Sequence, residues 1–222
     1  MVLTNPPFGT KKGGERPTRD DFTFPSSNKQ LNFLQHVYRS LKTTGKARAA
    51  IVIPDNVLFQ DGDGQKIRAD LMDKCDVHTI LRLPTGIFYA GGVKTNVIFI
   101  TRGKTEKGNT KQVWLYDLRT NMPSFGKTNP LREEHFNDFK KAFTAKDRKK
   151  VKDERFQPFS RVAIEKNGDS LDLGLIADDS LTAYEDLPDP IESAEVAIAK
   201  LQQAADLLQK VVKELHVAGI GK

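Results

Sequence analysis

Residues 47–54 read Ala-Arg-Ala-Ala-Ile-Val-Ile-Pro, a short apolar run with β-branched residues that a proline closes. A run of this kind is typical of a strand that is buried on both faces, as the inner strands of a parallel sheet are. Parallel strands need a crossover connection, usually a helix, to join them. The stretch therefore predicts a fold of the α/β class.

The segments around this run alternate between helical and extended patterns. Upstream, residues 29–42 carry apolar side chains at helical spacing, and Ser27 or Asn28 can cap the start of that helix. Downstream, residues 64–74 have the pattern of a second, shorter helix. Further strands are expected at residues 1–4, 77–83, 95–101 and 112–118. This order indicates an α/β sheet with helices on its faces.

Beyond residue 119 the character of the sequence changes. We expect residues 1–118 to form the sheet, 119–185 a small α-rich lobe, and 186–222 a long C-terminal helix. Within the lobe, residues 132–143 have a helical pattern, whereas residues 146–180 look irregular.

The tail carries a heptad pattern over residues 191–217. Its apolar residues follow one another in alternating steps of three and four, which is the spacing of a coiled-coil seam. The seam positions are Ile191, Ala194, Ile198, Leu201, Ala205, Leu208, Val212 and Leu215. This regularity predicts one continuous helix that packs against another helix.

The composition limits the classes of protein and site to consider. No apolar run approaches the ~20 residues of a membrane helix, and no secretory signal precedes the first strand. A single cysteine, Cys75, excludes an internal disulfide, and four scattered histidines offer no metal-ligand spacing. We therefore expect a cytoplasmic, metal-free protein. The net charge of +6 and the pI near 9.3 suit contact with phosphate backbones, but the signal is weak, and taken alone the basic clusters are better explained as solvated surface.

The chemically informative motif is Asn5-Pro6-Pro7-Phe8, directly after an apolar strand. The side-chain oxygen of Asn5 and the carbonyl oxygen of Pro6 can each accept one hydrogen of an amino group, and the prolines stiffen the turn. Phe8 offers a ring face on which a flipped-out base can stack. The alternative is an ordinary turn, because Asn-Pro commonly ends a strand.

A family resemblance follows from this motif and four further stretches. Residues 3–9 are similar to the catalytic motif of amino-group methyltransferases that act on adenine. Residues 49–59, 82–88, 92–97 and 114–119 resemble the modification (M) subunits of type I restriction-modification systems. The resemblance extends from Leu3 to about residue 215 and includes the helical tail.

The resemblance implies a class I, Rossmann-like fold, with this chain as the C-terminal half of its doubly wound sheet. Residues 1–4 would neighbour a first strand upstream, and residues 77–83 and 95–101 would pair antiparallel at the far edge. It implies S-adenosyl-L-methionine as methyl donor and adenine in double-stranded DNA as target. The implied partners are a specificity (S) subunit and a restriction (R) subunit. The helix that packs on the tail could belong to the chain's own α-rich lobe, to a second copy of the chain or to the S subunit, and the resemblance favours the S subunit.

The resemblance assigns the catalytic role to Asn5, Pro6, Pro7 and Phe8, and places Phe88, Lys94 and Asn96 near the target base. In this family an N-terminal helical domain and a glycine-rich cofactor loop precede the catalytic motif, and this sequence contains neither. No glycine-rich cofactor loop follows a strand in these residues. We expect that loop to lie upstream of residue 1, and this fragment alone to bind no S-adenosyl-L-methionine and to transfer no methyl group.

Two other functions stay open at this point. The same motif serves methyltransferases that act on RNA or on a protein glutamine side chain, whose amide also presents a planar amino group. Alternatively, the chain is an assembly module without activity, which docks to a partner through its tail.

Overall fold

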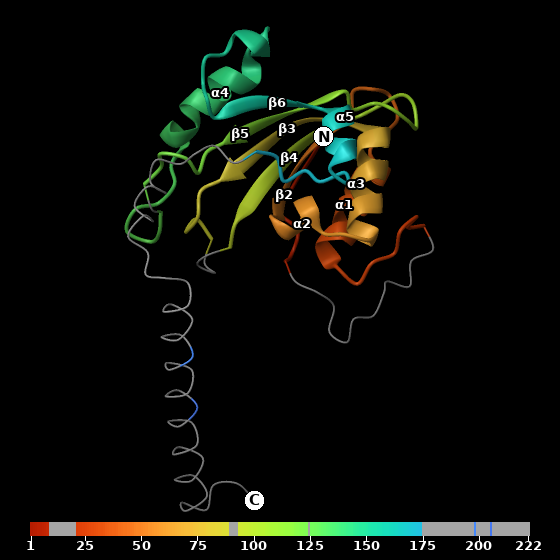
Figure 1. The fold of residues 1–222 in the computed structure, drawn as a ribbon, viewed down its shortest axis with the longest axis horizontal. Coiled ribbons are helices and arrows are strands. Elements are labelled where there is room, and N and C mark those ends of the chain that lie inside the picture. The colour runs from red at the N-terminus through yellow and green to blue at the C-terminus, as the bar shows by residue number, and fades with distance from the viewer. Residues whose placement is uncertain (9–20, 89–92, 124, 175–197, 199–204, 206–222) are drawn as a thin grey trace, which may run out of the picture. The chain divides into compact units, whose positions relative to one another are not determined.

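The structure is a computed structural model that describes residues 1–8, 21–88, 93–123 and 125–174, together with Ile198 and Ala205. A six-stranded sheet in the order β1-β2-β4-β3-β5-β6 lies at its centre (Figure 1). The strands are β1 (Val2–Thr4), β2 (Arg48–Pro54), β3 (Cys75–Leu83), β4 (Thr95–Arg102), β5 (Gln112–Asp117) and β6 (Phe156–Ser160).

The strand directions bring four strand ends to one edge. β1 runs parallel to β2, and β3 runs parallel to β5. β4 lies between β2 and β3 and is antiparallel to both, so β2 and β3 are parallel to each other. β1, β2, β3 and β5 therefore all end on the same side of the sheet, which we name the carboxyl edge.

The sheet has an apolar centre that gives way to polar residues near the carboxyl edge. One row of paired residues crosses all six strands, namely Thr4, Ile51, Ile98, Ile80, Leu115 and Gln157. Ile51, Ile98 and Ile80 are 0% exposed. Two residues nearer the edge, the row consists of Ile53, Asn96, Arg82 and Asp117, all of them buried. This second row has to satisfy charge and hydrogen bonds inside the fold.

Four helices cover one face of the sheet: α1 (Lys29–Ser40), α2 (Asn56–Phe59), α3 (Asp63–Lys74) and α5 (Arg161–Lys166) (Figure 1). Asn28 caps α1 by accepting hydrogen bonds from the backbone N–H groups of Gln30 and Leu31, as the sequence allowed. Leu31, Leu34 and Tyr38 follow at helical spacing and are 0% exposed in the core beneath the sheet.

The second face carries an aromatic cluster under α4 (Asn137–Thr144), which a 3₁₀ turn at Glu133–Phe136 precedes. Phe139 of α4 packs edge-to-face on Tyr116, with ring centroids 5.4 Å apart. Phe143 packs on Phe99 at 4.9 Å. Near β1 this face is open in the described part of the chain, since Leu3 is 69% exposed.

The structure corrects three expectations about the strands. Residues 77–83 and 95–101 do pair antiparallel, but β5 and β6 extend the sheet beyond them, so the pair is internal. Residues 146–180 are not irregular throughout, because they contain β6 and α5. Pro158 weakens the strand pattern there, yet β6 tolerates it as an edge strand, where one side of the backbone needs no partner.

The third correction concerns β2. Ala49, Ile51 and Ile53 are buried on the helical face, whereas Ala50 and Val52 on the other face are only partly buried. β2 is therefore fully buried on one face among the described residues, where the sequence predicted burial on both.

The contacts group residues 1–176 as one unit and residues 177–222 as another. The helix predicted at 191–217 and the tail domain lie outside the described residues except at Ile198 and Ala205, which are both helical. The division at residues 118 and 185 stays a prediction. Among the described residues, no helix is long and apolar enough to cross a membrane.

The central row gives a direct test of the fold. We expect Ile80→Ala to lower the free energy of unfolding by roughly 2–5 kcal/mol, because it leaves a cavity where the sheet meets α1 and α3. Val162→Ala, at a position that is 61% exposed, is the matched control and should change it by less than about 0.5 kcal/mol. Urea denaturation of the purified protein measures both, and equal losses would contradict the position of the core.

Candidate active site at the carboxyl edge

The motif Asn5-Pro6-Pro7-Phe8 lies at the carboxyl edge, where β1 ends at Thr4. Pro6 is buried and anchors the turn, while Asn5 and Pro7 are exposed. Because Thr4 pairs with Ile51 of β2, the motif begins just beyond the apolar centre of the sheet. Ligands of open α/β sheets characteristically bind outside the carboxyl ends of the strands.

Phe8 meets Phe88, the last described residue before the gap at 89–92. Their ring centroids are 6.0 Å apart with an interplanar angle of 66°, which is an edge-to-face contact. Phe8 is 36% exposed and Phe88 is partly buried. In the strand order, β4 and β2 lie between β3 and β1. The connection that follows β3 therefore passes the start of β4 and the end of β2 to reach the end of β1.

An ion pair joins the ends of two parallel strands at the same edge. Asp55 directly follows β2, and Arg119 lies two residues beyond β5. The guanidinium of Arg119 donates from Nη1 to Oδ2 of Asp55 at 3.0 Å and from Nη2 to Oδ1 at 2.6 Å. This two-bond geometry fixes the direction of both side chains.

Arg119 also binds the connection between β3 and β4 at both of its ends. Its Nε donates to the carbonyl oxygen of Leu83 and its Nη2 to that of Thr95, each at 3.0 Å. The backbone N–H of Asp55 donates to the carbonyl oxygen of Lys94 at 3.1 Å. The segment that carries Phe88 is thus tied to Asp55 and Arg119 where it leaves β3 and where it enters β4.

Asn96 supports this arrangement from inside the sheet. It is 0% exposed, and its Nδ2 donates to Oδ1 of Asp55 at 2.7 Å. Within the described residues, its Oδ1 and the hydroxyl of the adjacent Thr95 are buried without a hydrogen-bond partner. Asn96 therefore acts on the edge through Asp55.

The charges at the edge are mutually stabilising. Partial burial opposes the charged form of Asp55, but the hydrogen bonds and the positive charge of Arg119 outweigh it and hold the pKa of this carboxyl below its ordinary value. Arg82 is 4% exposed and pairs with Asp117 and Asp172. The backbone N–H of Arg119 donates to Oδ1 of Asp117 at 2.8 Å, which joins both ion pairs into one network.

The residues singled out from the sequence fare differently. The structure brings Phe88 to Phe8, leaves the side chain of Lys94 exposed, and buries Asn96. That these three face a target base stays a prediction. Sequence reasoning overlooked Asp55 and Arg119 as site residues. The signal that could have found them is their place, since each follows the end of a parallel strand.

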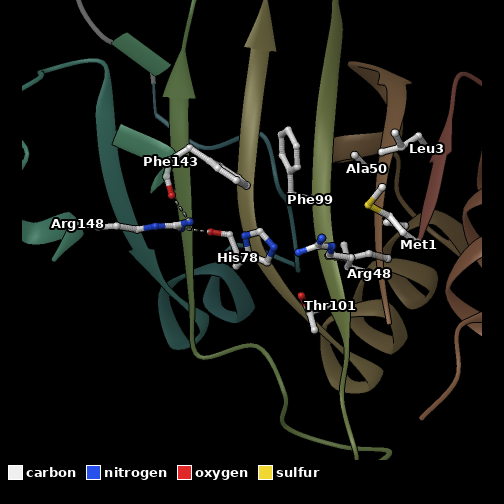
Figure 2. Close-up of a pocket in the computed structure, with 11 residues that line it drawn as sticks. Met1, Leu3, Arg48, Ala50, His78, Phe99, Thr101, Phe143 and Arg148 are labelled. Atoms are coloured by element: carbon white, nitrogen blue, oxygen red, sulfur yellow. Dashed lines mark hydrogen bonds between the residues drawn. The ribbon is translucent and has the colours of Figure 1, made fainter. Parts of the chain in front are cut away.

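A hollow lies elsewhere in the described part of the chain, towards the amino ends of the parallel strands. Figure 2 shows its lining, in which Met1, Leu3 and Phe99 form the apolar part and Arg48 and His78 add polar groups. Its volume is about 570 Å³. It contains none of the carboxyl-edge residues, so it is separate from the candidate site.

The chemistry of the carboxyl edge is that of hydrogen-bond acceptors beside an aromatic face. Asn5, whose side chain carries an amide oxygen, is exposed, and the rings of Phe8 and Phe88 are in contact. Among the described residues, no group of three or more histidine, cysteine, aspartate or glutamate side chains could hold a metal ion. The arrangement suits a planar, amino-bearing substrate that is held by acceptors and stacked on a ring.

Comparisons with known proteins point in the same direction. The family model described as N-6 DNA Methylase matches residues 1–176. The chain is similar to the methylase subunit of type I restriction enzyme EcoKI from Escherichia coli (strain K12), with 43% identity over 250 aligned residues that include 97% of this chain and 46% of that protein. The chain thus spans about half the length of the curated relatives it matches.

Two solved structures share the fold. The crystal structure of the EcoKI M protein matches with a TM-score of 0.70 and 41% identity, over 96% of this chain and 50% of that chain. A structure on complex assembly and conformational transition of the type I R-M system matches with a TM-score of 0.68 and 29% identity, over 97% and 45%. These matches confirm the expected α/β fold of class I methyltransferases.

His78, which lines the hollow near the amino ends of the strands, makes the stability of the fold depend on pH. Burial, reinforced by the charge of Arg148, lowers the pKa of His78 from 6.5 to about 4. On lowering the pH below about 6.5, the unfolded chain takes up a proton that the folded chain refuses until about pH 4, so stability falls across that window. We expect His78→Gln to weaken this loss between pH 7 and pH 5 in urea denaturation, with His36→Gln as control. An unchanged pH dependence in His78→Gln would refute the assignment.

Proposed function

Since the chain belongs to the N-6 DNA methylase family, we propose that it carries the catalytic edge of a type I methylase (M) subunit. The reaction is transfer of a methyl group from S-adenosyl-L-methionine to the exocyclic amino group of adenine in double-stranded DNA. The single observation that carries the proposal is the exposed Asn5 at the end of β1, next to the paired rings of Phe8 and Phe88.

Asn5 and Pro6 are the groups that hold the target amino nitrogen. The Asn5 side-chain oxygen accepts one amino hydrogen and the Pro6 carbonyl oxygen accepts the other, which draws the nitrogen lone pair out of conjugation with the ring. Pro6 is buried and Pro7 follows it, so the turn is rigid before substrate arrives. Acceptors set in advance stabilise the transition state without a cost for reorganising them.

Phe8 takes the target base by stacking. A base inside a duplex cannot reach an enclosed site, so it has to be flipped out of the helix and received by a ring face. Phe8 is 36% exposed and is in edge-to-face contact with Phe88. Such stacking contributes roughly 1–3 kcal/mol per base.

The cofactor is S-adenosyl-L-methionine, which when bound supplies a methyl group on a positively charged sulfur. The residues at the end of β1 suit a methyl transfer from this cofactor in one respect. The exposed Asn5 at the end of β1 can hold the amino nitrogen that takes the methyl group, and that nitrogen then loses one proton to water. The glycine-rich loop expected for the cofactor has no counterpart after a strand in this sequence.

The partners follow from the relatives. The EcoKI and related proteins are named as methylase subunits of type I restriction enzymes, and one matched structure concerns assembly of the type I R-M system. We therefore place this chain in a cytoplasmic complex with a specificity (S) subunit and a restriction (R) subunit on double-stranded DNA. The heptad seam of residues 191–217 is the docking element, either for the S subunit or for a second copy.

One experiment separates this function from its rivals. The full-length protein, assembled with its specificity subunit, is incubated with S-adenosyl-L-methionine that is tritiated in the methyl group. Unmethylated double-stranded DNA, RNA and a glutamine-containing peptide are offered in separate reactions. We expect label in DNA alone, recovered as N6-methyladenine in the nucleoside digest. Label in RNA or in the peptide would show that the enzyme acts on that substrate and would contradict the proposed action on DNA. No label in any substrate would favour an assembly module without activity.

Removal of the Asn5 acceptor tests the chemical step. In the full-length protein we expect Asn5→Ala to lower kcat by about 10²–10³-fold, equivalent to roughly 3–4 kcal/mol in the transition state, by analogy with an oxyanion-hole donor. DNA binding, measured by fluorescence anisotropy, should change little. Asn5→Asp keeps an oxygen acceptor and should retain more turnover. Near-normal turnover in Asn5→Ala would remove this residue from the mechanism.

The tail is tested by charges placed on the seam. Leu201→Asp combined with Leu208→Asp should abolish co-purification with the specificity subunit while the α/β part stays folded, because a buried aspartate lacks a partner. Gln202→Asp combined with Gln209→Asp adds the same charge at the same spacing off the seam, and should assemble normally. Normal assembly of the seam variant would end the docking role of this helix.

A further inference from the structure

We propose that Asp55 and Arg119 are positioning residues that hold Phe88 against Phe8, so that the two rings together form one wall of the site for the flipped base. The inference deepens the proposed function and rests on it. Neither side chain belongs to the Asn-Pro-Pro-Phe motif, and each is contributed by the end of a different parallel strand.

Arg119 constrains the connection between β3 and β4 at both of its ends. Leu83 is the last residue of β3 and Thr95 is the first of β4. Arg119 donates to the carbonyl oxygens of both, at 3.0 Å each. Leu83 and Thr95 are partners in the ladder between β3 and β4, which sets their distance, and the guanidinium ties these two ends of the segment that presents Phe88 to Asp55.

The orientation of the Arg119 guanidinium is fixed by its own hydrogen-bond partners. Asp55 accepts from both of its terminal nitrogens, and the Arg119 backbone N–H is itself held by Asp117. Asp55 is held in turn by the amide of Asn96, and its own N–H binds Lys94. Arg119 and Asp55 are 20% and 25% exposed, so water competes little with these bonds. A planar guanidinium whose hydrogen-bond partners are all fixed is restricted to one orientation.

The residues between the end of β3 and Phe88 constrain where the Phe88 ring lies. Pro84 is buried directly after β3. Gly86 has φ +81°, and a Cβ there would lie 2.0 Å from the carbonyl oxygen of Phe125, so only glycine lets the segment approach so closely. Phe125 is 5% exposed and belongs to the packed interior. Two residues later, the chain delivers Phe88 to Phe8 at 6.0 Å.

A purely structural ion pair would stabilise the fold without affecting the ring. The chain offers a matched control, because Arg161 pairs with Asp169 at 2.8 Å with side chains that are 20% and 13% exposed. Arg161 begins α5 and binds no residue of the β3–β4 connection in the described contacts. Arg119→Gln and Arg161→Gln therefore remove ion pairs of similar burial, and only the first touches the segment with Phe88.

The test uses the full-length protein with 4-fluorophenylalanine at position 88. We expect the fluorine resonance to move towards the value of a solvent-exposed ring in Arg119→Gln and to stay in place in Arg161→Gln. The double variant with Asp55→Asn and Arg119→Gln leaves no unpaired charge, so it should fold and still show the shift. Arg119→Lys keeps the charge but loses the fork, and should also show it.

Kinetics supply the second readout. In Arg119→Gln we expect KM for DNA to rise about ten-fold with kcat nearly unchanged, because a displaced ring weakens capture of the base. A fluorine resonance that stays in place in folded Arg119→Gln and in the double variant would overturn the positioning role, whatever the activity. A shifted resonance with an unchanged KM for DNA would overturn the link to base capture. An unmodified protein that methylates no DNA would refute the proposed function instead.

Discussion

The end of four parallel strands at one edge is the constraint on which this structure depends. A parallel arrangement aligns the strand ends, so residues that are distant in sequence meet there. Asn5, Asp55 and Arg119 follow three different strands, and they lie at the same edge because of the register through Ile51, Ile98 and Ile80. The apolar row determines where the polar groups stand.

The antiparallel β4 has a particular consequence in this arrangement. Because β4 enters between β2 and β3, the connection from β3 to β4 must turn at the carboxyl edge itself. That turn passes the end of β2 and reaches β1, which puts Phe88 beside Phe8. A helical crossover would have left the edge for the face of the sheet. The aromatic contact is therefore a product of topology as well as of residue type.

The sequence predicted the α/β class, the cap of α1 and the place of the Asn5–Phe8 motif directly after a strand, because each has a local signature. A strand of β-branched residues, an asparagine before a helical stripe, and a proline-stiffened turn are all visible within a few residues. The pairing of Asp55 with Arg119 has no such signature, since the two are 64 residues apart and nothing local in the sequence marks their meeting. The edge strand β6 was missed for a different reason, because Pro158 obscures its pattern.

Three arginines illustrate how this fold secures contacts that sequence patterns do not reveal. Arg68 is 1% exposed and donates to carbonyl oxygens of Val57, Gln60 and Asp169. Arg82 and Arg119 likewise bind backbone oxygens of segments other than their own. A lysine offers a point charge with three donors at one atom, whereas a guanidinium offers five donors in a fixed plane. Arg68 and Arg119 each satisfy several carbonyl oxygens at once, and Arg82 satisfies one together with two carboxylates. A buried loop requires such donors because its carbonyls have no water to bind. At the carboxyl edge, side chains hold the loops beyond the point where strand pairing ends, and the proposed site for a flipped base would depend on that constraint.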